Sequence, residues 1–163
     1  MATKNPHKPG AKKHDKEGFR LIASYKKAEL DYEIDEKLEA GIVLHGSEVK
    51  VLRAGKCVIS SAHVRVVGGQ ALLFGMQIPE YPWSHQFNHE PDRSRKLLLH
   101  KREIAHLQDK LEAKGAAIVV TKVYFQGANV KVELAIGTGR KFFDRRNAIK
   151  DREMKREVER HHR

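Results

Sequence analysis

The chain has 163 residues, with 32 Lys or Arg, 21 Asp or Glu and a formal net charge of +11 when histidine is neutral, so it favours an anionic partner such as nucleic acid or an anionic membrane surface. This length allows one domain with a hydrophobic core plus tails, and no apolar run approaches the ~18 residues of a membrane-spanning helix. The single cysteine excludes an intramolecular disulfide, and the N-terminus lacks the apolar segment of a signal peptide, so we expect a cytoplasmic protein.

Three segments are expected along the chain. Residues 1–18 carry lysines, prolines and almost no apolar side chains, which predicts a disordered basic arm. Residues 19–138 should form the folded body, because apolar alternation and helical periodicity occur only there. Residues 139–163 form a separate, basic C-terminal tail.

The first half of the body predicts a strand, a short helix and a hairpin. Residues 41–44 predict the end of a strand that begins near Tyr32. Ser47 is a suitable N-cap for a helix over EVKVLRAG, which Gly55 would end. Residues 63–67 and 70–75 predict two strands joined at a pair of glycines, and residues 79–91, with three prolines, predict a long loop.

The second half predicts one helix and two strands. Residues 101–114 form the clearest helix, with Ile104, Leu107 and Leu111 on one face and Gly115 as its end. Residues 117–125 and 130–136 predict strands joined by QGAN, the second of which turns Lys131 and Glu133 away from its apolar face. At least five short strands with two helices suggest a mainly β (α+β) fold, a small closed antiparallel barrel rather than a parallel sheet. An all-antiparallel α+β sheet is the alternative.

One stretch of the body suits phosphate binding. In PDRSRKLLLHKRE, at residues 91–103, we expect residues 97–99 to enter the core while the surrounding cations stay in solvent. A merely soluble basic edge would look similar. Aromatic side chains near basic residues or exposed loops could stack on bases, namely Tyr32, Tyr81, Trp83 and Phe143, although a core or barrel-rim position suits Tyr32 equally well.

Nothing in the sequence argues for catalysis, a cofactor or a metal. The spacing of His85, His89 and His100 fits no zinc signature. Cys57 and His63 lack a third orienting group, and GTGRK lacks the length and the terminal Ser or Thr of a phosphate-binding loop. We therefore expect a protein that binds rather than an enzyme.

The tail of residues 139–163 holds ten Lys or Arg against five Asp or Glu. Its apolar side chains form only a thin stripe, while no Gly or Pro follows Gly139. Such a segment cannot offset its ordering entropy by burial alone, so we expect it to become helical against a polyanion. A solvated helical extension is equally compatible with the charge pattern.

Four blocks, in this order and at these separations, resemble the SmpB family, whose members are partners of tmRNA in bacteria. The blocks are LEAGIVLHGSEVKVLRAGK at residues 38–56, DRSRKLLLHKRE at 92–103, VKVELAIGTGRK at 130–141 and FDRRNAIKDREMKRE at 143–157. The resemblance implies an OB-like closed antiparallel barrel with two or three flanking helices and a basic tail that is helical when bound. It also implies a non-enzymatic adaptor that binds the tRNA-like domain of tmRNA and delivers it to stalled ribosomes for trans-translation.

The resemblance also suggests site residues and partners. For tmRNA these residues are Tyr32, Glu39, Lys50, Arg53, His63, Arg95, Lys96, Leu98 and Lys131. For the decoding centre and mRNA channel of the ribosome they are Arg140, Lys141, Phe143, Asp144, Arg145, Arg146, Ile149 and Lys150. His63 stands where the family usually has Tyr, and Arg145 where most members have Lys. Elongation factor Tu would be met only indirectly, through charged tmRNA, and we expect a monomer that does not bind membranes.

Two other functions are compatible in part with these features. Small basic OB-like domains with basic tails also occur among ribosomal structural proteins. An enzyme acting on RNA would need an acid–base pair or metal ligands, which we do not find in the sequence.

Overall fold

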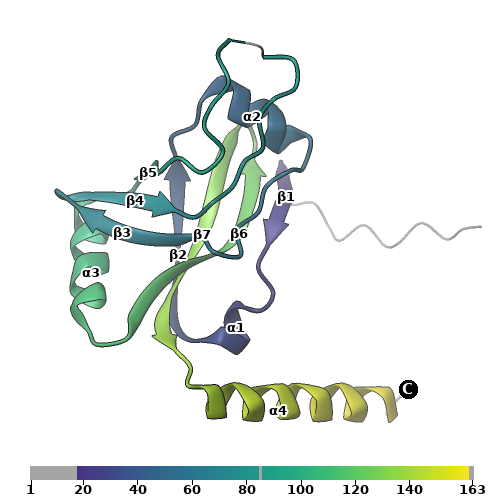
Figure 1. Cartoon of the computed structure of the whole chain (residues 1–163). Coiled ribbons are helices and arrows are strands. Elements are labelled where there is room, and N and C mark those ends of the chain that lie inside the picture. Colours follow the sequence, from purple (N-terminus) through teal and green to yellow (C-terminus); the bar gives the residue numbers. More distant parts are fainter. Residues whose placement is uncertain (1–17, 85, 162–163) are drawn as a thin grey trace, which may run out of the picture.

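The structure is a computed structural model that describes residues 18–84 and 86–161. The predicted basic arm, apart from Gly18, and His85 lie outside the described residues. In chain order the elements are β1 (Phe19–Ser24), α1 (Ala28–Asp31), β2 (Tyr32–Ile42), α2 (Gly46–Arg53), β3 (His63–Val67), β4 (Gln70–Phe74), β5 (Arg95–Leu98), α3 (Lys101–Glu112), β6 (Ala116–Gln126), β7 (Asn129–Gly139) and α4 (Phe142–His161) (Figure 1).

The strands form one antiparallel sheet that closes on itself. In the described part of the chain the sheet has seven strands in the order β1-β6-β3-β4-β5-β2-β7, and β7 also pairs with β6. The six strands from β2 to β7 therefore form a ring, while β1 is added to β6 outside it (Figure 1). Closure gives most strands a partner on both sides, which limits unpaired edges. The mainly β, α+β class predicted from the sequence is confirmed.

Side-chain alternation explains which face of the long strands is inside. In β7, Val130, Val132, Leu134 and Ile136 are buried in the core, as predicted. The register shifts between Ile34 and Glu36 in β2 and between Val120 and Lys122 in β6. Such bulges bend a strand and increase its twist, which lets long strands curve around a ring.

The two turns of the sheet are tight. β3 and β4 pair from His63↔Phe74 to Val67↔Gln70, and both Gly68 and Gly69 have positive φ, at 58° and 72°. A two-residue hairpin of this twist needs positive φ at both positions, so the predicted hairpin is confirmed. β6 and β7 extend beyond their predicted bounds, because the outer residues of QGAN, Gln126 and Asn129, pair with each other.

Both longer helices of the body have a histidine as the N-cap, and a glutamate in the first turn of each helix bonds the backbone of that histidine. The backbone N–H of His45 donates to Glu48 Oε2 at 2.7 Å, and that of His100 donates to Glu103 Oε2 at 2.7 Å. Our expectation that Ser47 is the N-cap of α2 was wrong, because this contact from the third helical residue starts the helix at Gly46. α3 presents Leu107 to the core, with Ile104 and Leu111 packed beside it, as predicted.

Three short elements were not predicted: β1, α1 and β5. In β5, Arg95 and Leu97 point inward and are buried, while Lys96 and Leu98 point outward and are exposed. The expectation that residues 97–99 enter the core together while Arg95 stays in solvent was therefore wrong. Successive side chains of a strand point to opposite faces of the sheet, so the neighbours Leu97 and Leu98 lie on different faces.

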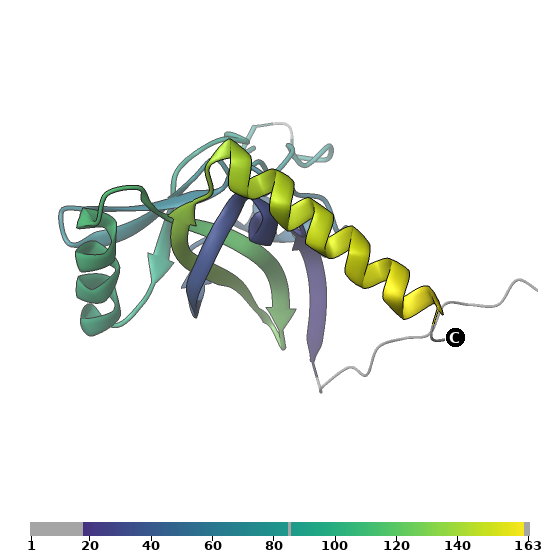
Figure 2. The ribbon, with the colours of Figure 1, turned by 90° about the horizontal axis from the view of Figure 1, so that it is seen from below.

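The C-terminal tail is a 20-residue helix, α4, that projects from the ring beside α1 (Figures 1 and 2). Among the body helices it contacts α1 most. Ile149, Met154 and Val158 are exposed at 43%, 62% and 53%. The helix agrees with the helix-forming character expected of the tail, while ordering of the tail on binding to a polyanion stays a prediction. None of the helices described is both long and apolar enough to cross a membrane.

Candidate nucleic-acid interface

A cluster of polar side chains lies on the outer face of β2, β6 and β7. Lys131 Nζ donates to Glu39 Oε1 at 2.8 Å, and the Tyr124 hydroxyl donates to Glu39 Oε2. The register places Lys131 opposite both Tyr124 of β6 and Gly41 of β2, and Gly41 shares a face with Glu39. The three functional groups therefore come from three neighbouring strands.

The charge state of this cluster follows from its hydrogen bonds. The bond from Lys131, and after it the bond from Tyr124, holds the pKa of Glu39 below its ordinary value. Burial, followed by the bond to Glu39, raises the pKa of Tyr124. Glu39 is thus an anion at neutral pH, and each of its oxygens keeps a lone pair that can accept a further hydrogen bond. The Lys131 ammonium has three donors, and the bond to Glu39 uses one of them.

Leu98 completes the cluster from a fourth strand. Leu98 pairs with Gly41 and is 56% exposed, so an apolar side chain stands beside the charged pair. A Cβ atom at Gly41 would lie 3.1 Å from the Leu98 Cβ, so glycine lets these groups approach closely. Glu39, Leu98 and Lys131 line one shallow hollow of about 350 Å³. The structure thus brings together three of the residues singled out in the sequence, with exposed Lys96 two residues from Leu98.

Arg95 belongs to a different structure, a buried ion pair. Its Nε donates to Glu48 Oε1 at 2.9 Å, and neither side chain has any exposed surface. Its other nitrogens donate to the carbonyl oxygens of Met76 at 2.6 Å and Pro91 at 3.0 Å. Arg95 therefore has no surface to offer to RNA, and we withdraw it from the predicted binding residues.

Glu48 holds this ion pair together from α2. Its second oxygen accepts a bond from Arg93 Nη2 at 2.5 Å. Burial raises the pKa of Glu48, but the bonds from Arg93 and the His45 backbone and the charge of Arg95 outweigh burial and hold the pKa below its ordinary value. The carboxylate thereby fixes β5 and the preceding loop against α2.

The other residues predicted for tmRNA lie apart from the Glu39 cluster. Tyr32 is half-buried at the start of β2, about 23 Å along the strand from Glu39 at ~3.3 Å per residue. The His63 ring lies on β3, 5.9 Å from the Phe74 ring. On α2, the Lys50 ammonium lies 5.1 Å from the centre of the Tyr81 ring, and Arg53 is exposed at the last helical position.

Asp31 ties the tail to the body. Its carboxylate accepts a bond from the Tyr25 hydroxyl and lies 3.8 Å from Arg145 Nε, while its carbonyl accepts the Arg140 N–H at 2.9 Å. The bond to Asp31, followed by burial, raises the pKa of Tyr25 to about 12. Lys141, just before α4, is exposed, as are the predicted ribosome-facing residues of α4, namely Asp144, Arg145, Arg146, Ile149 and Lys150; Phe143 falls in the first turn of α4.

Two of the groups considered for catalysis or metal binding, His89 and Cys57, lie in surroundings that argue for a structural role. His89 is buried, with Nδ1 2.9 Å from Ser47 Oγ and Nε2 2.9 Å from the carbonyl oxygen of Ile78. Burial raises the pKa of the Cys57 thiol to about 11, so at neutral pH it is not a nucleophilic thiolate. Within the described ranges, no group of three His, Cys, Asp or Glu is placed to hold a metal ion.

Sequence reasoning missed Tyr124, which fixes the orientation of Glu39. The sequence of β6 does carry a signal, because Tyr124 brings a hydroxyl group between the apolar residues Val123 and Phe125. It also missed Gly41, whose role depends on the approach of β5. That approach leaves no trace in the local sequence.

Comparison with protein families gives one match over most of the chain. The family model described as SmpB protein matches residues 22–163.

Similar proteins carry the name SsrA-binding protein. That of Syntrophobacter fumaroxidans is 47% identical over 144 residues, which cover 88% of this chain and 89% of the relative. That of Pelotomaculum thermopropionicum is 44% identical over 141 residues, covering 86% of this chain and 92% of the relative. A solved structure described as "tmRNA-SmpB: a journey to the center of the bacterial ribosome" contains a chain that is 41% identical, with a TM-score of 0.63 over 74% of this chain and 85% of that one.

Proposed function

Because this chain belongs to the SmpB protein family, we propose that it is an RNA-binding adaptor that binds the tRNA-like domain of tmRNA and delivers that RNA to stalled ribosomes for trans-translation. The observation that carries this proposal is the likeness over nearly the whole chain to proteins named SsrA-binding protein, together with the related chain described with tmRNA and the bacterial ribosome. The net charge of +11 agrees with a polyanionic partner.

The surface around Glu39, Leu98 and Lys131 is the proposed contact with tmRNA. Lys131 and the neighbouring Lys96 supply charge for backbone phosphates. The free lone pairs of Glu39 can accept from a ribose 2′-hydroxyl or a base amino group, and Leu98 offers apolar contact to a ribose or base. Lys50, Arg53, Tyr32 and His63 lie further away, so they would meet other parts of the same RNA.

The antiparallel ring supports the proposal that the fold is an OB-like barrel. OB-folds are small, partly open barrels that use one sheet face and adjacent loops to bind oligonucleotides. The Glu39 cluster lies on such an outer sheet face, across β2, β5, β6 and β7. We propose residues 19–138 as the tmRNA-binding body and residues 139–163 as the tail.

The tail is proposed to bind the ribosome, at the decoding centre and in the mRNA channel. Its helix carries Lys and Arg along its length and buries few of its side chains, so its surface is available to RNA. The proposed contacts are Arg140, Lys141, Phe143, Asp144, Arg145, Arg146, Ile149 and Lys150. The tail would fill a channel that an intact mRNA otherwise occupies. The adaptor acts as a monomer in the cytoplasm, needs no cofactor, catalyses no reaction and meets elongation factor Tu only through charged tmRNA.

Purification of the full chain from bacterial cells, followed by sequencing of the bound RNA, tests this function. We expect tmRNA to be enriched over all other RNAs, and ribosomes to be washed away at high salt. Ribosomal RNA retained in equal amounts at high salt, without tmRNA, would instead identify a ribosomal structural protein. Cleavage of the bound RNA by the purified protein would identify an enzyme.

A further inference from the structure

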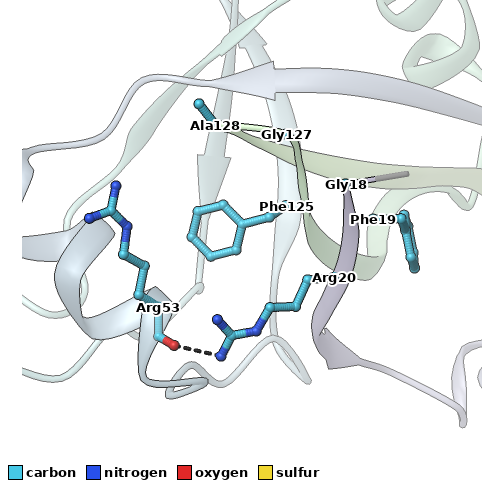
Figure 3. Close-up of a pocket in the computed structure, with 7 residues that line it drawn as sticks. All are labelled: Gly18, Phe19, Arg20, Arg53, Phe125, Gly127 and Ala128. Carbon is cyan, nitrogen blue, oxygen red and sulfur yellow. Dashed lines mark hydrogen bonds between the residues drawn. The ribbon is translucent and has the colours of Figure 1, made fainter. Parts of the chain in front are cut away.

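A pocket of about 370 Å³ lies where β1, the end of α2 and the turn between β6 and β7 meet (Figure 3). Its walls are the side chains of Arg20, Arg53, Phe125 and Ala128 and the backbone of Gly18 and Gly127. The volume lies at the lower end of small-molecule sites, which span about 300–1,000 Å³. None of the residues assigned so far except Arg53 lies in it.

The pocket presents two guanidinium groups without acidic partners. Figure 3 shows the side chains of Arg20 and Arg53 beside the ring of Phe125. Arg20 Nη2 donates to the carbonyl oxygen of Arg53 at 2.6 Å, at the C-terminal end of α2. This bond uses one of five donors of Arg20 and fixes its side chain in the pocket. Across residues 18–84 and 86–161, neither arginine forms an ion pair with an Asp or Glu.

Two aromatic rings lie between the edge of the pocket at Phe19 and the Glu39 cluster. The Phe19 ring lies 4.8 Å from the Tyr124 ring, and Tyr124 donates to Glu39. Phe19 is 38% exposed and points to the opposite side of β1 from Arg20 (Figure 3). One strand edge thus carries an exposed aromatic ring on one side and a guanidinium on the other.

The sequence before the pocket adds positive charge. Residues 1–17 contain five lysines and join the described chain at Gly18, on the rim of the pocket. The charge of this segment favours an anionic partner.

We infer that this pocket is a second RNA-binding site of the same interface, in which Arg20 and Arg53 bind a backbone phosphate while a neighbouring base stacks on Phe19. The inference rests on the proposed function, because it takes tmRNA as the occupant. Guanidinium groups bind phosphate oxygens bidentately, and base stacking on an exposed ring tolerates any sequence. The RNA path therefore extends from Leu98 past Glu39 and Phe19 to the end of α2.

Binding of a tRNA-like-domain transcript across a salt titration tests the pocket. Arg53→Gln removes its charge without touching the backbone carbonyl that Arg20 needs. We expect about tenfold weaker binding and a slope against log salt that is smaller by about 0.7 to 0.9. The matched control is Lys114→Gln, which removes one exposed charge beyond α3. Lys131→Gln reports on the proposed interface itself. An unchanged melting temperature in each variant separates binding from folding.

The outcomes separate the two proposals. If Arg53→Gln behaves like Lys114→Gln while Lys131→Gln binds weakly, the pocket is not an RNA site and the proposed function stands. If Lys131→Gln also binds normally, the proposed interface fails together with the pocket.

A cross-linking experiment gives a readout that does not depend on affinity. In a Cys57→Ala background, Ala128→Cys places a thiol-linked photo-cross-linker in the pocket, Lys96→Cys places it at the Glu39 surface and Lys114→Cys serves as the remote control. We expect cross-links to bound tmRNA from positions 128 and 96 but not from 114. Cross-links from 96 alone would overturn the pocket assignment, and cross-links from neither 96 nor 128 would overturn the interface.

Discussion

Arg95 and Glu48 lie 47 residues apart in the chain, yet they meet at 2.9 Å inside the fold, where neither side chain is exposed to solvent. Glu48 also closes the first turn of α2 and bonds Arg93, so one carboxylate joins a helix, a strand and the loop before that strand. Removing one partner of a buried ion pair leaves the other charge unpaired, which costs more than the pair itself contributes. This carboxylate is therefore the polar group on which the packing of β5 depends.

Glu48→Gln should lower the free energy of unfolding by about 3–5 kcal/mol, because Arg95 is left charged and buried. Urea unfolding measures the loss. Glu103→Gln is the matched control, since Glu103 caps α3 in the same way as Glu48 caps α2 but lies outside any buried ion pair. We expect the control to lose less than about 1 kcal/mol, within the range of a single cap. Equal, small losses in the two variants would show that the ion pair does not hold the fold.

Acid should destabilise the protein through the same carboxylate. The pKa of Glu48 is lowered in the folded state, because the bonds from Arg93 and the His45 backbone and the charge of Arg95 outweigh its burial. The folded state then binds this proton more weakly than the unfolded chain, so the contribution is present above the ordinary pKa of 4.5 and is lost as pH falls below it. The melting temperature of the protein should therefore decrease as the pH is lowered below 4.5. The fall should be smaller in Glu48→Gln; an identical pH profile would assign the effect to other carboxyls.

Lys131→Ala should weaken binding of the tRNA-like domain and reduce its salt dependence by about one counterion. Stability should change by less than about 1 kcal/mol, because Lys131 and Glu39 form a surface pair. Lys37→Ala is the control, since Lys37 also lies on the sheet surface and pairs with Glu133 and Glu29. A salt titration of binding is the measurement. Affinities that are equal for Lys131→Ala and the wild type at every salt concentration would exclude this site.

Replacing Asp144, Arg145 and Arg146 together by Ala should preserve tmRNA binding and abolish peptide tagging on stalled ribosomes. The cations suit backbone phosphates, and Asp144 suits the first turn of a helix, where the macrodipole favours negative charge. Tagging in cells lacking the native gene is the measurement, at equal protein level. Normal tagging by the triple variant would remove this motif as the ribosome-reading element.

The triple variant needs one control, because Arg145 also lies 3.8 Å from Asp31. Asp31→Asn weakens that attachment of α4 but leaves the motif intact. Tagging by this variant should be close to normal if the motif itself reads the ribosome. Equal loss of tagging in both variants would indicate that the placement of α4 on the body matters instead.

Deleting residues 142–163 should leave the body folded and able to bind tmRNA, because the body contacts of α4 are few and centre on α1. Deleting residues 139–163 should be more harmful, since Gly139 ends β7, pairs with Tyr32 and bonds the Gly115 carbonyl oxygen at 3.3 Å. In thermal unfolding, the variant that lacks residues 142–163 should have a higher melting temperature than the variant that lacks residues 139–163. Loss of cooperative unfolding in both would mean that the tail is part of the core.

Local patterns predicted the elements whose residues pack in a regular period. In each case a few neighbouring residues indicate the element and where it ends. The examples are the alternation of β7, the glycine pair of the β3–β4 hairpin and the apolar face of α3. The SmpB family was also recognisable from the chain, because four blocks in a fixed order do not depend on how they fold together. The same resemblance points to Glu39, Leu98 and Lys131 as binding residues.

No local pattern predicted the burial of Arg95, the N-cap of α2 at His45 or the contact between Glu39 and Tyr124. An arginine in a basic stretch has the composition of an exposed residue, and only a carboxylate brought from a distant helix makes its burial favourable. Likewise, β5 joins β2 because Leu98 pairs with Gly41, which is far away in the chain, and this pairing places Leu98 beside Lys131. Contacts between strands far apart in the chain decide which charges are buried and which remain for RNA, because burial is a property of the closed ring and not of any segment in it.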